Sequence, residues 1–244
     1  MHRHYSRAPI VEAIIDLQAV APAGIGLEEL REIHKSLIDK YPTLVNTSNM
    51  TITSDFQGGT FGASGSEEKI GFVFISPDGK QSVSMKLDGF RFSRLAPYDT
   101  WEAMRDEARS LWDVYRSIVK PAEVSRVAVR YVNRIDIPTP FRDFRDYFRT
   151  FPEVSTDLPQ SLSFYSMSLH IPQLVSNTFL ILNQVLLPPQ KPDFASVIID
   201  IDVFRDNAGC ASDEEVWELL EVVRNAKNEA FEASITNSAR ELII

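Results

Sequence analysis

Cysteine and histidine are scarce in this chain, and their scarcity excludes several classes of protein. The 244 residues include one cysteine, Cys210, so neither an intrachain disulfide nor a cysteine-rich zinc module can form. A single thiol fits a reducing compartment, and we expect a cytoplasmic protein. The four histidines, His2, His4, His34 and His170, lack the spacing of a metal-binding motif, so we expect no metal and no other cofactor.

Long hydrophobic runs and the common catalytic motifs are also missing. No stretch of about 20 apolar residues could cross a membrane, so we expect no membrane association. Glu12 and Asp16 interrupt the first apolar segment, which argues against a signal peptide. The glycines at 58–65 lack the Lys-Ser/Thr pair of a phosphate-binding loop, and no Gly-x-Ser-x-Gly nucleophile elbow occurs. The sequence therefore carries no signature of an enzyme.

Basic residues are outnumbered by acidic ones. The chain has 25 Lys and Arg against 34 Asp and Glu, a net charge of -9. This balance argues against a protein that coats nucleic acid through phosphate neutralisation alone, although a local basic face remains compatible with it. Hydrophobic residues make up 44% and charged residues 24%, which is typical of globular proteins and excludes collagen-like, coiled-coil and disordered chains.

The first half of the chain alternates strand and helix patterns. The apolar periodicity predicts, in order, a strand at 10–20, a helix at 27–41, strands at 50–56, 70–75, 83–87 and 90–95, and a long helix at 100–119. A glycine- and serine-rich loop is expected at 58–66, and Asp99 or Thr100 is expected to cap the long helix.

The second half shows a similar order. The predicted elements are a strand at 124–137, a short helix at 141–151, strands at 162–171, 178–187 and 195–204, and a long helix from 213 to near the C terminus. Arg142, Arg145 and Arg149 share one side of the short helix, where Asp146 is spaced to pair with Arg142 and Arg149. Cys210 is expected in a loop.

Short sequence matches indicate that the two halves are repeats. Residues 82–91 match residues 196–205 at five positions, and Trp101 and Trp217 begin the two long helices. The expected units are 1–120 and 121–244, joined in one compact pseudo-symmetric domain. The predicted fold class is α+β, with two strand-helix-multistrand-helix repeats forming a curved antiparallel sheet and the long helices packed on one face. A single α+β domain whose halves share only a binary pattern is the alternative.

Two resemblances accompany this pattern. The element order resembles the TATA-binding-protein-like duplicated fold, which implies an architecture and no particular function. A set of short motifs also resembles an uncharacterised, sporadically distributed prokaryotic family of about this length, and the match spans nearly the whole chain. That resemblance brings no known activity, and it implies a mobile or defence-type locus as the genomic context. The motifs are Ala8-Pro9-Ile10-Val11-Glu12-Ala13, Arg130-Tyr131-Val132-Asn133-Arg134-Ile135, Asp200-Ile201-Asp202 and Trp217…Asn228…Phe231…Ile235-Thr236.

The strand at 124–137 carries the most informative charge pattern. Alternation along a strand places Arg126, Arg130 and Arg134 on one face, with Asn133 among the apolar residues of the other. Guanidinium groups bind carboxylates and phosphates through paired, charge-assisted hydrogen bonds. This arginine face therefore predicts a groove that holds an anion.

A second strand supplies acidic partners for these arginines. At 195–204, alternation places Asp200 and Asp202 on one face, which is expected to adjoin the arginine face. The alternative to a ligand site is that the arginines pair with Asp136, Asp200 or Asp202 across the sheet. The candidate ligand-binding residues are Arg130, Asn133, Arg134, Asp200 and Asp202.

Three functions from different classes follow from these patterns. The first is a non-enzymatic binding protein that recognises a protein partner or an anionic ligand on an open sheet face. The second is a magnesium-dependent enzyme acting on nucleotides or nucleic acid, in which Asp136, Asp200 and Asp202 hold the ion, because carboxylate oxygens suit hard cations. The third is a nucleic-acid-binding module that uses the arginine face. The absence of catalytic motifs favours the first.

Overall fold

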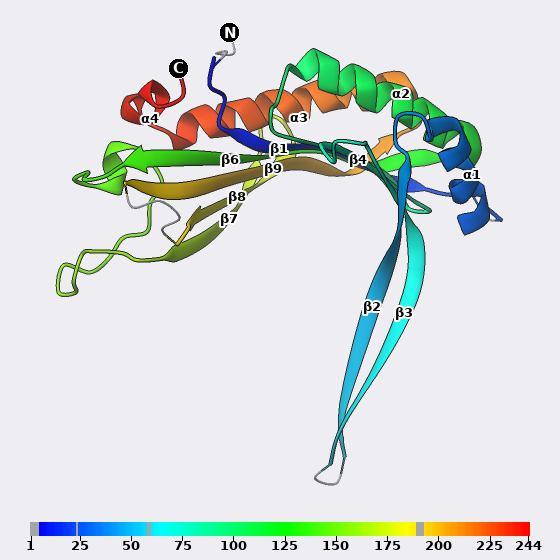
Figure 1. Cartoon of the computed structure of the whole chain (residues 1–244), viewed down its shortest axis with the longest axis horizontal. Helices are drawn as coiled ribbons and strands as arrows, with labels where there is room; N and C mark the ends of the chain where they lie inside the picture. Colours follow the sequence, from blue (N-terminus) through cyan, green and yellow to red (C-terminus); the bar gives the residue numbers. More distant parts are fainter. Residues whose placement is uncertain (1–4, 23, 58–59, 189–192) are drawn as a thin grey trace.

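One nine-stranded antiparallel sheet spans both halves of the chain (Figure 1). The computed structural model describes the backbone of residues 5–22, 24–57, 60–188 and 193–244, and the side chains of these residues outside 52–64. Within them the fold is mixed α+β, as predicted. The strands are β1 (Ile10–Val20), β2 (Thr43–Gln57), β3 (Thr60–Ile75), β4 (Gln81–Lys86), β5 (Gly89–Leu95), β6 (Glu123–Pro138), β7 (Tyr165–Gln173), β8 (Thr178–Leu186) and β9 (Phe194–Cys210).

The strand order places the first strand of each half of the chain near the middle of the sheet. The sheet runs β2-β3-β4-β5-β1-β6-β9-β8-β7, so β1 and β6 are neighbours with Ile15 opposite Val129. Both strands are rich in branched residues, which suit a sheet paired on both edges. The halves of the chain thus meet along β1 and β6, with no break in the sheet between them.

Three helices cover one face of this sheet (Figure 1). The helices are α1 (Leu27–Leu37), α2 (Trp101–Val119), α3 (Asp213–Ser234) and the short C-terminal α4 (Asn237–Glu241). Helix α1 packs on β3 and β4, α2 on β5, and α3 on β6, β8 and β9. The core lies between the two layers, where Trp112, Tyr115, Phe90 and Phe92 are almost fully buried. No helix in the described ranges is long and apolar enough to cross a membrane.

The opposite side of the sheet is called the open face here; Asp16, Arg126, Arg130, Asp200 and Phe204 belong to it. Alternation along β6 explains the division, because Val127, Val129 and Tyr131 are buried toward the helices while the residues between them point the other way. No helix covers this face in the part of the chain that the structure describes.

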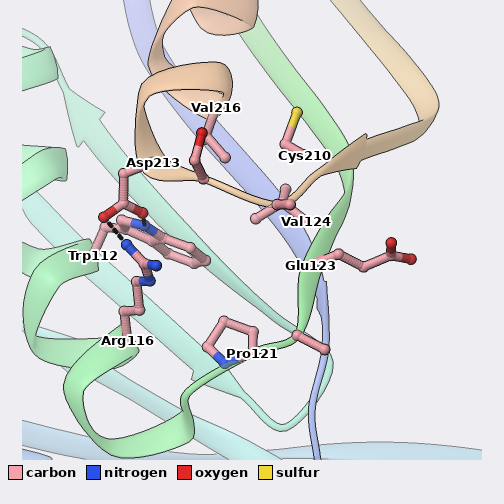
Figure 2. A pocket seen from close by; sticks show the side chains of 11 residues that line it. Trp112, Arg116, Pro121, Glu123, Val124, Cys210, Asp213 and Val216 are labelled. Carbon is pink, nitrogen blue, oxygen red and sulfur yellow. Dashed lines mark hydrogen bonds and ion pairs between the residues drawn. The ribbon is translucent and has the colours of Figure 1, made fainter.

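Side chains of α3 contact both ends of α2. The side chain of Thr100 caps α2, as predicted, and that of Ser212 caps α3 in a capping box with Glu215. Asp213 follows that cap and accepts hydrogen bonds from Trp112 Nε1 at 3.0 Å and from Arg116 Nη1 (Figure 2).

At the other end of α2, Trp101 Nε1 donates to Glu221 Oε1 at 2.8 Å. The first residue of α3, Asp213, contacts the second half of α2, whereas the first residue of α2, Trp101, contacts α3 further along, at Glu221. The two helices therefore run antiparallel. The capping turn of α3 is therefore also its anchor to α2.

The expected loop at 58–66 is wrong. Residues 60–66 belong to β3, which pairs with β2 as far as Thr60 opposite Gln57; residues 58 and 59 lie outside the described residues. Glycine and serine have low strand propensity, but the antiparallel partner supplies backbone hydrogen bonds at every second residue and overrides it. The result is a long hairpin that projects away from the helices (Figure 1).

The expected helix at 141–151 is also wrong, since a single 3-10 turn, Phe144–Asp146, forms there. The Asp143 side chain accepts a hydrogen bond from the Arg145 backbone and pairs with its guanidinium, so local side-chain bonding replaces the helical pattern. Phe148 forms a β-bridge with Ile235, which a continuous helix could not do. The predicted pairing of Asp146 with Arg142 and Arg149 does not occur.

Two further expectations need correction. Residues 82–91 span most of β4, a turn and the start of β5, whereas residues 196–205 lie within the single strand β9. Asp88 and Asp202, which the sequence match aligned, therefore occupy a turn and a mid-strand position. The match over these residues therefore does not align equivalent elements. Cys210 is the last residue of β9 and is buried, not exposed in a loop.

The contacts of Asp213 predict its importance for stability. Asp213→Ala leaves Trp112 Nε1 and Arg116 without their shared acceptor and should lower the free energy of unfolding by about 1–3 kcal/mol. Glu214→Ala is the matched control, because Glu214 is an exposed acid in the same helical turn and should cost at most about 1 kcal/mol. Urea unfolding measures both, and equal losses would refute the role of the anchor.

Candidate binding face

The structure brings four of the five predicted site residues to the same face. Arg130, Arg134, Asp200 and Asp202 lie on the open face, as the alternation of β6 and β9 predicts. Asn133 does not join them: it is 3% exposed and its side-chain amide donates to the backbone oxygens of neighbouring residues on the helix side. Its position, odd-numbered like the buried residues of β6, explains the difference. Asn133 therefore cannot share a ligand with the arginines.

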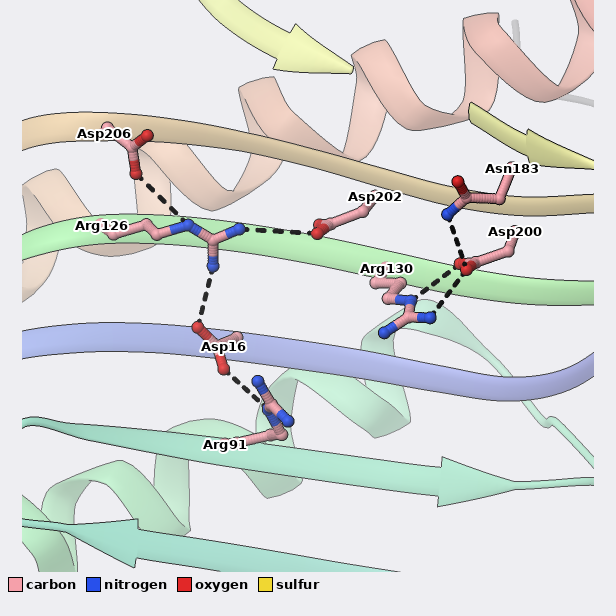
Figure 3. A network of polar contacts seen from close by, with 8 residues as sticks. All are labelled: Asp16, Arg91, Arg126, Arg130, Asn183, Asp200, Asp202 and Asp206. Carbon is pink, nitrogen blue, oxygen red and sulfur yellow. Dashed lines mark hydrogen bonds and ion pairs between the residues drawn. The ribbon is translucent and has the colours of Figure 1, made fainter. Parts of the chain in front are cut away.

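Arg130 and Asp200 form a bidentate ion pair. Arg130 Nε donates to Asp200 Oδ1 at 2.8 Å and Nη2 to Oδ2 at 2.7 Å, while Asn183 Nδ2 also donates to Oδ2 at 3.2 Å (Figure 3). The register places Arg130 opposite Asp202, so its pairing with Asp200 is diagonal. These hydrogen bonds raise the pKa of the Arg130 guanidinium above its usual value. For Arg130, the alternative prediction, that the arginine pairs with an aspartate across the sheet, is confirmed.

Arg134 is held in the same way, by residues further along β6 and β9. Its Nε donates to Asp136 Oδ1 at 2.8 Å and its Nη2 to Ser196 Oγ at 3.0 Å. Ser196 Oγ donates in turn to Asp136 Oδ1 at 2.6 Å, which closes a triangle of three side chains. Both predicted anion-binding arginines thus already have carboxylate partners.

The centre of the polar network is a residue outside the predicted site. Arg126 contacts three carboxylates, those of Asp16 at 2.9 Å, Asp206 at 3.3 Å and Asp202 at 3.5 Å (Figure 3). Asp16 is also bonded to Arg91 Nε at 2.7 Å. Side chains from β1, β5, β6 and β9 are thereby connected.

The two residues at this centre differ in how far the sequence could identify them. Arg126 shares a strand face with Arg130, and that signal was visible in the alternation of β6. Asp16 had no such signal, because its role depends on β1 lying between β5 and β6.

Asp202 has one oxygen without a partner. Its Oδ1 is buried and makes no hydrogen bond, and its other oxygen lies 3.5 Å from Arg126. Burial raises the pKa of this carboxyl above its usual value, against the opposing effects of Arg126 and Arg130. The ionised form of Asp202 is therefore the least satisfied charge of the network.

The predicted magnesium ligands do not converge. Asp136 lies four residues along β6 from Val132, the residue opposite Asp200. At about 3.3 Å per residue this places the two backbones roughly 13 Å apart, too far for one ion. Among the described residues, no group of three Asp, Glu, His or Cys side chains is arranged to hold a metal.

Charge on the open face is close to balanced. The network contains four guanidinium groups and five carboxylates: Arg91, Arg126, Arg130 and Arg134 against Asp16, Asp136, Asp200, Asp202 and Asp206. Phosphate binding requires cationic groups whose charge is not already compensated. The face is therefore a paired polar surface and not a basic groove.

Apolar side chains emerge beside this network. Phe179 of β8 is 50% exposed and stacks on Phe204 at 5.9 Å between ring centroids, and Arg126 lies 4.4 Å from the centre of the Phe204 ring. In the adjoining β7–β8 turn, Leu174 and Val175 are 90% and 106% exposed. Apolar residues in a tight turn were a signal in the sequence that the prediction missed.

That turn is held in place by an arginine. Arg205 of β9 donates from Nη2 to the Ser176 oxygen at 2.6 Å and from Nε to the Asn177 oxygen at 2.9 Å. Asn177 adopts a positive φ of 50°, which asparagine tolerates better than most residues. Leu174 and Val175 are therefore presented on a fixed support. We call Leu174, Val175 and Phe179 the apolar patch.

The unequal surroundings of the arginines predict unequal costs of their removal. Arg126 is 17% exposed in its side chain and contacts three carboxylates, of which, among the described residues, only Asp16 has a second cation, Arg91. Arg126→Met therefore leaves Asp202 and Asp206 without their arginine, which should cost about 3 kcal/mol of unfolding free energy. Arg91→Met is the control, because Arg91 is 51% exposed and pairs with one carboxylate, so at most about 1 kcal/mol is expected. Denaturant unfolding of both variants tests the difference, and a larger loss in Arg91→Met would contradict it.

The raised pKa of Asp202 predicts a pH effect with a defined sign. The folded chain keeps the proton of the Asp202 carboxyl at pH values at which the unfolded chain has already released it. The contribution of Asp202 to stability therefore falls as the pH rises from about 4. Asp202→Asn should therefore stabilise the protein at neutral pH and reduce this dependence. Asp206→Asn, at an exposed carboxylate on the same arginine, should not stabilise it. Unfolding at acidic and neutral pH distinguishes the two, and destabilisation by Asp202→Asn at neutral pH would disprove the assignment.

Comparison with known proteins adds no assignment to this geometry. A scan of the chain against protein-family models finds no match, and a search among curated proteins finds no significant relative. The contacts of the open face are therefore the basis for the functional proposal.

Proposed function

We propose that this chain is a non-enzymatic binding protein that recognises a protein partner on its open face. The apolar patch carries this proposal: Leu174, Val175 and Phe179 are exposed, and hydrogen bonds from Arg205 hold the turn that contains Leu174 and Val175. Exposed apolar side chains that cluster beside polar residues are typical of protein interaction sites. A prearranged support reduces the entropy lost on binding.

The neighbouring stack strengthens the proposal. Aromatic residues and arginine are enriched at the energetic centres of protein interfaces, and Phe179, Phe204 and Arg126 lie together on the open face. The surrounding ion pairs would form a polar rim, which contributes more to orientation and specificity than to affinity. This arrangement matches an apolar contact region bordered by charges.

A protein partner fits better than an anionic small ligand or nucleic acid. An incoming carboxylate or phosphate would have to displace Asp200 from Arg130, or Asp136 from Arg134. Each displacement leaves a carboxylate without its cation, which opposes binding. The magnesium-dependent enzyme would need its three aspartates to converge, which the spacing along β6 opposes.

We also propose that the halves 1–120 and 121–244 are related repeats in a TATA-binding-protein-like arrangement. The position of β1 and β6 at the centre of the sheet supports this, since each is the first strand of its half. Reciprocal contacts between the long helices support it as well: Arg224 of α3 lies 5.6 Å from the Trp101 ring and Arg109 of α2 lies 5.8 Å from the Trp217 ring. The proposed binding face would then combine strands of both repeats.

The proposal predicts that charge in the apolar patch abolishes partner binding. The full chain, carrying a photo-crosslinking side chain at position 181, two residues after Phe179 on β8, would be irradiated in cells of its source, and the attached proteins quantified. Leu174→Lys with Val175→Lys should remove a specific crosslinked protein, because lysine would have to be buried without a partner. Ile38→Lys, at a 49% exposed apolar residue after α1, should leave it unchanged.

Three outcomes would count against this function. They are a crosslinking pattern identical in all variants, equal loss with Ile38→Lys, and attachment of nucleic acid in place of protein. Thermal unfolding of each variant shows whether the fold is retained, and Phe179→Lys provides a second substitution on the same patch.

A further inference from the structure

A pocket outside the open-face network shares no lining residue with it, although Ala195 of the lining directly precedes Ser196 of the network. The irregular segment between β6 and β7 folds against the end of β8 and the start of β9, and encloses a pocket of about 490 Å³. This volume falls within the range of small-molecule sites in proteins, about 300–1,000 Å³. No step of the proposed function uses it.

Aromatic rings form much of the pocket wall. Phe141 packs edge-to-face on Phe144 at 4.7 Å between centroids, and Phe144 stacks on Phe151 at 5.3 Å. Leu186 and Phe194 contribute from the sheet. Rings favour offset or edge contacts with another ring, so this wall suits a flat aromatic group.

Two arginines line the same pocket and have different surroundings. Arg145 pairs with Asp143 at 3.5 Å and lies 5.9 Å from the centre of the Phe151 ring. Arg142 makes no ion pair or hydrogen bond with any residue that the structure describes. Since Arg145 compensates Asp143, the one carboxylate among the described residues of the lining, the charge of Arg142 remains available for an anion.

Internal hydrogen bonds hold the opposite wall. Gln160, also in the lining, donates from Nε2 to the Ser155 oxygen at 2.9 Å and to the Leu158 oxygen at 2.8 Å. The Asp143 side chain fixes the turn that carries Arg145. The irregular segment is therefore arranged before any ligand binds, which lowers the cost of binding.

We propose that this pocket binds an aromatic carboxylic acid as its carboxylate. The ring would lie against Phe141, Phe144 and Phe151, and the carboxylate would accept hydrogen bonds from the Arg142 guanidinium. Aromatic walls with one uncompensated guanidinium match a flat apolar body that carries a single negative charge. The site is independent of Arg126 and the apolar patch, so either proposal can fail without the other.

The probe is naphthoate, titrated into the full chain by calorimetry, with naphthylmethanol as its uncharged counterpart. Naphthoate should bind, and naphthylmethanol should bind at least about tenfold more weakly because it lacks the charge. Arg142→Gln should weaken naphthoate binding by about tenfold or more. Leu162→Trp should abolish it by filling the pocket. Decanoate, which has the charge without the ring, should bind more weakly than naphthoate.

Arg149→Gln is the matched control, since Arg149 is an exposed arginine of the same segment outside the pocket lining. The affinity of the Arg149→Gln variant for naphthoate should stay within about twofold of that of the unaltered chain. Absence of naphthoate binding, equal binding of naphthylmethanol, or unchanged affinity in Arg142→Gln would overturn the proposal. Equal or tighter binding of decanoate would overturn the assignment to aromatic acids. Thermal unfolding of Arg142→Gln, an exposed position, would show that the loss is local.

Discussion

The antiparallel pairing of β1 with β6 is the constraint on which the rest of the structure depends. β1 also pairs with β5, where Asp16 lies opposite Arg91, so this strand connects the two halves of the sheet. Because side chains alternate along a strand, the register determines which residues face the helices. A slip of β1 by one residue would turn Asp16 toward the helices and Ile15 toward the open face, and a slip of β6 would do the same to Arg126 and Val127. The polar network and the core are thus two results of the same pairing.

The two faces of the sheet accommodate polar groups by different means. On the open face, charges are retained by pairing, as Arg130 and Asp200 show. Under α3, Lys227 lies 3.5 Å from the centre of the Tyr131 ring, and burial lowers its pKa to about 7, so its charge is reduced near neutral pH. Tyr131 in turn shares a hydrogen bond with Tyr98 at 2.6 Å. Charge is therefore paired on the open face and reduced by burial under the helix layer.

Patterns of hydrophobicity predicted most of the fold, and they failed where other forces dominate. Strand β1 and helix α2 agree with the expected ranges within a residue, since long alternating or helical patterns have few competing solutions. The hairpin of β2 and β3 is longer than predicted because cross-strand hydrogen bonding outweighs the low strand propensity of glycine and serine. The helix expected at 141–151 was wrong because Phe148 pairs with Ile235 in the last part of the chain. No local pattern contains that contact.

The sequence by itself determined the α+β class, the long helices, and the placement of Arg130 and Asp200 on strand faces, because these depend on local periodicity. The tertiary structure alone decided that Arg130 bonds Asp200 and that Asp16 lies beside Arg126. It also decided that Phe141 and Arg142 line a pocket. Each of these depends on strand order and on chain segments distant in sequence, since charge and ring contacts act over a few ångströms of space.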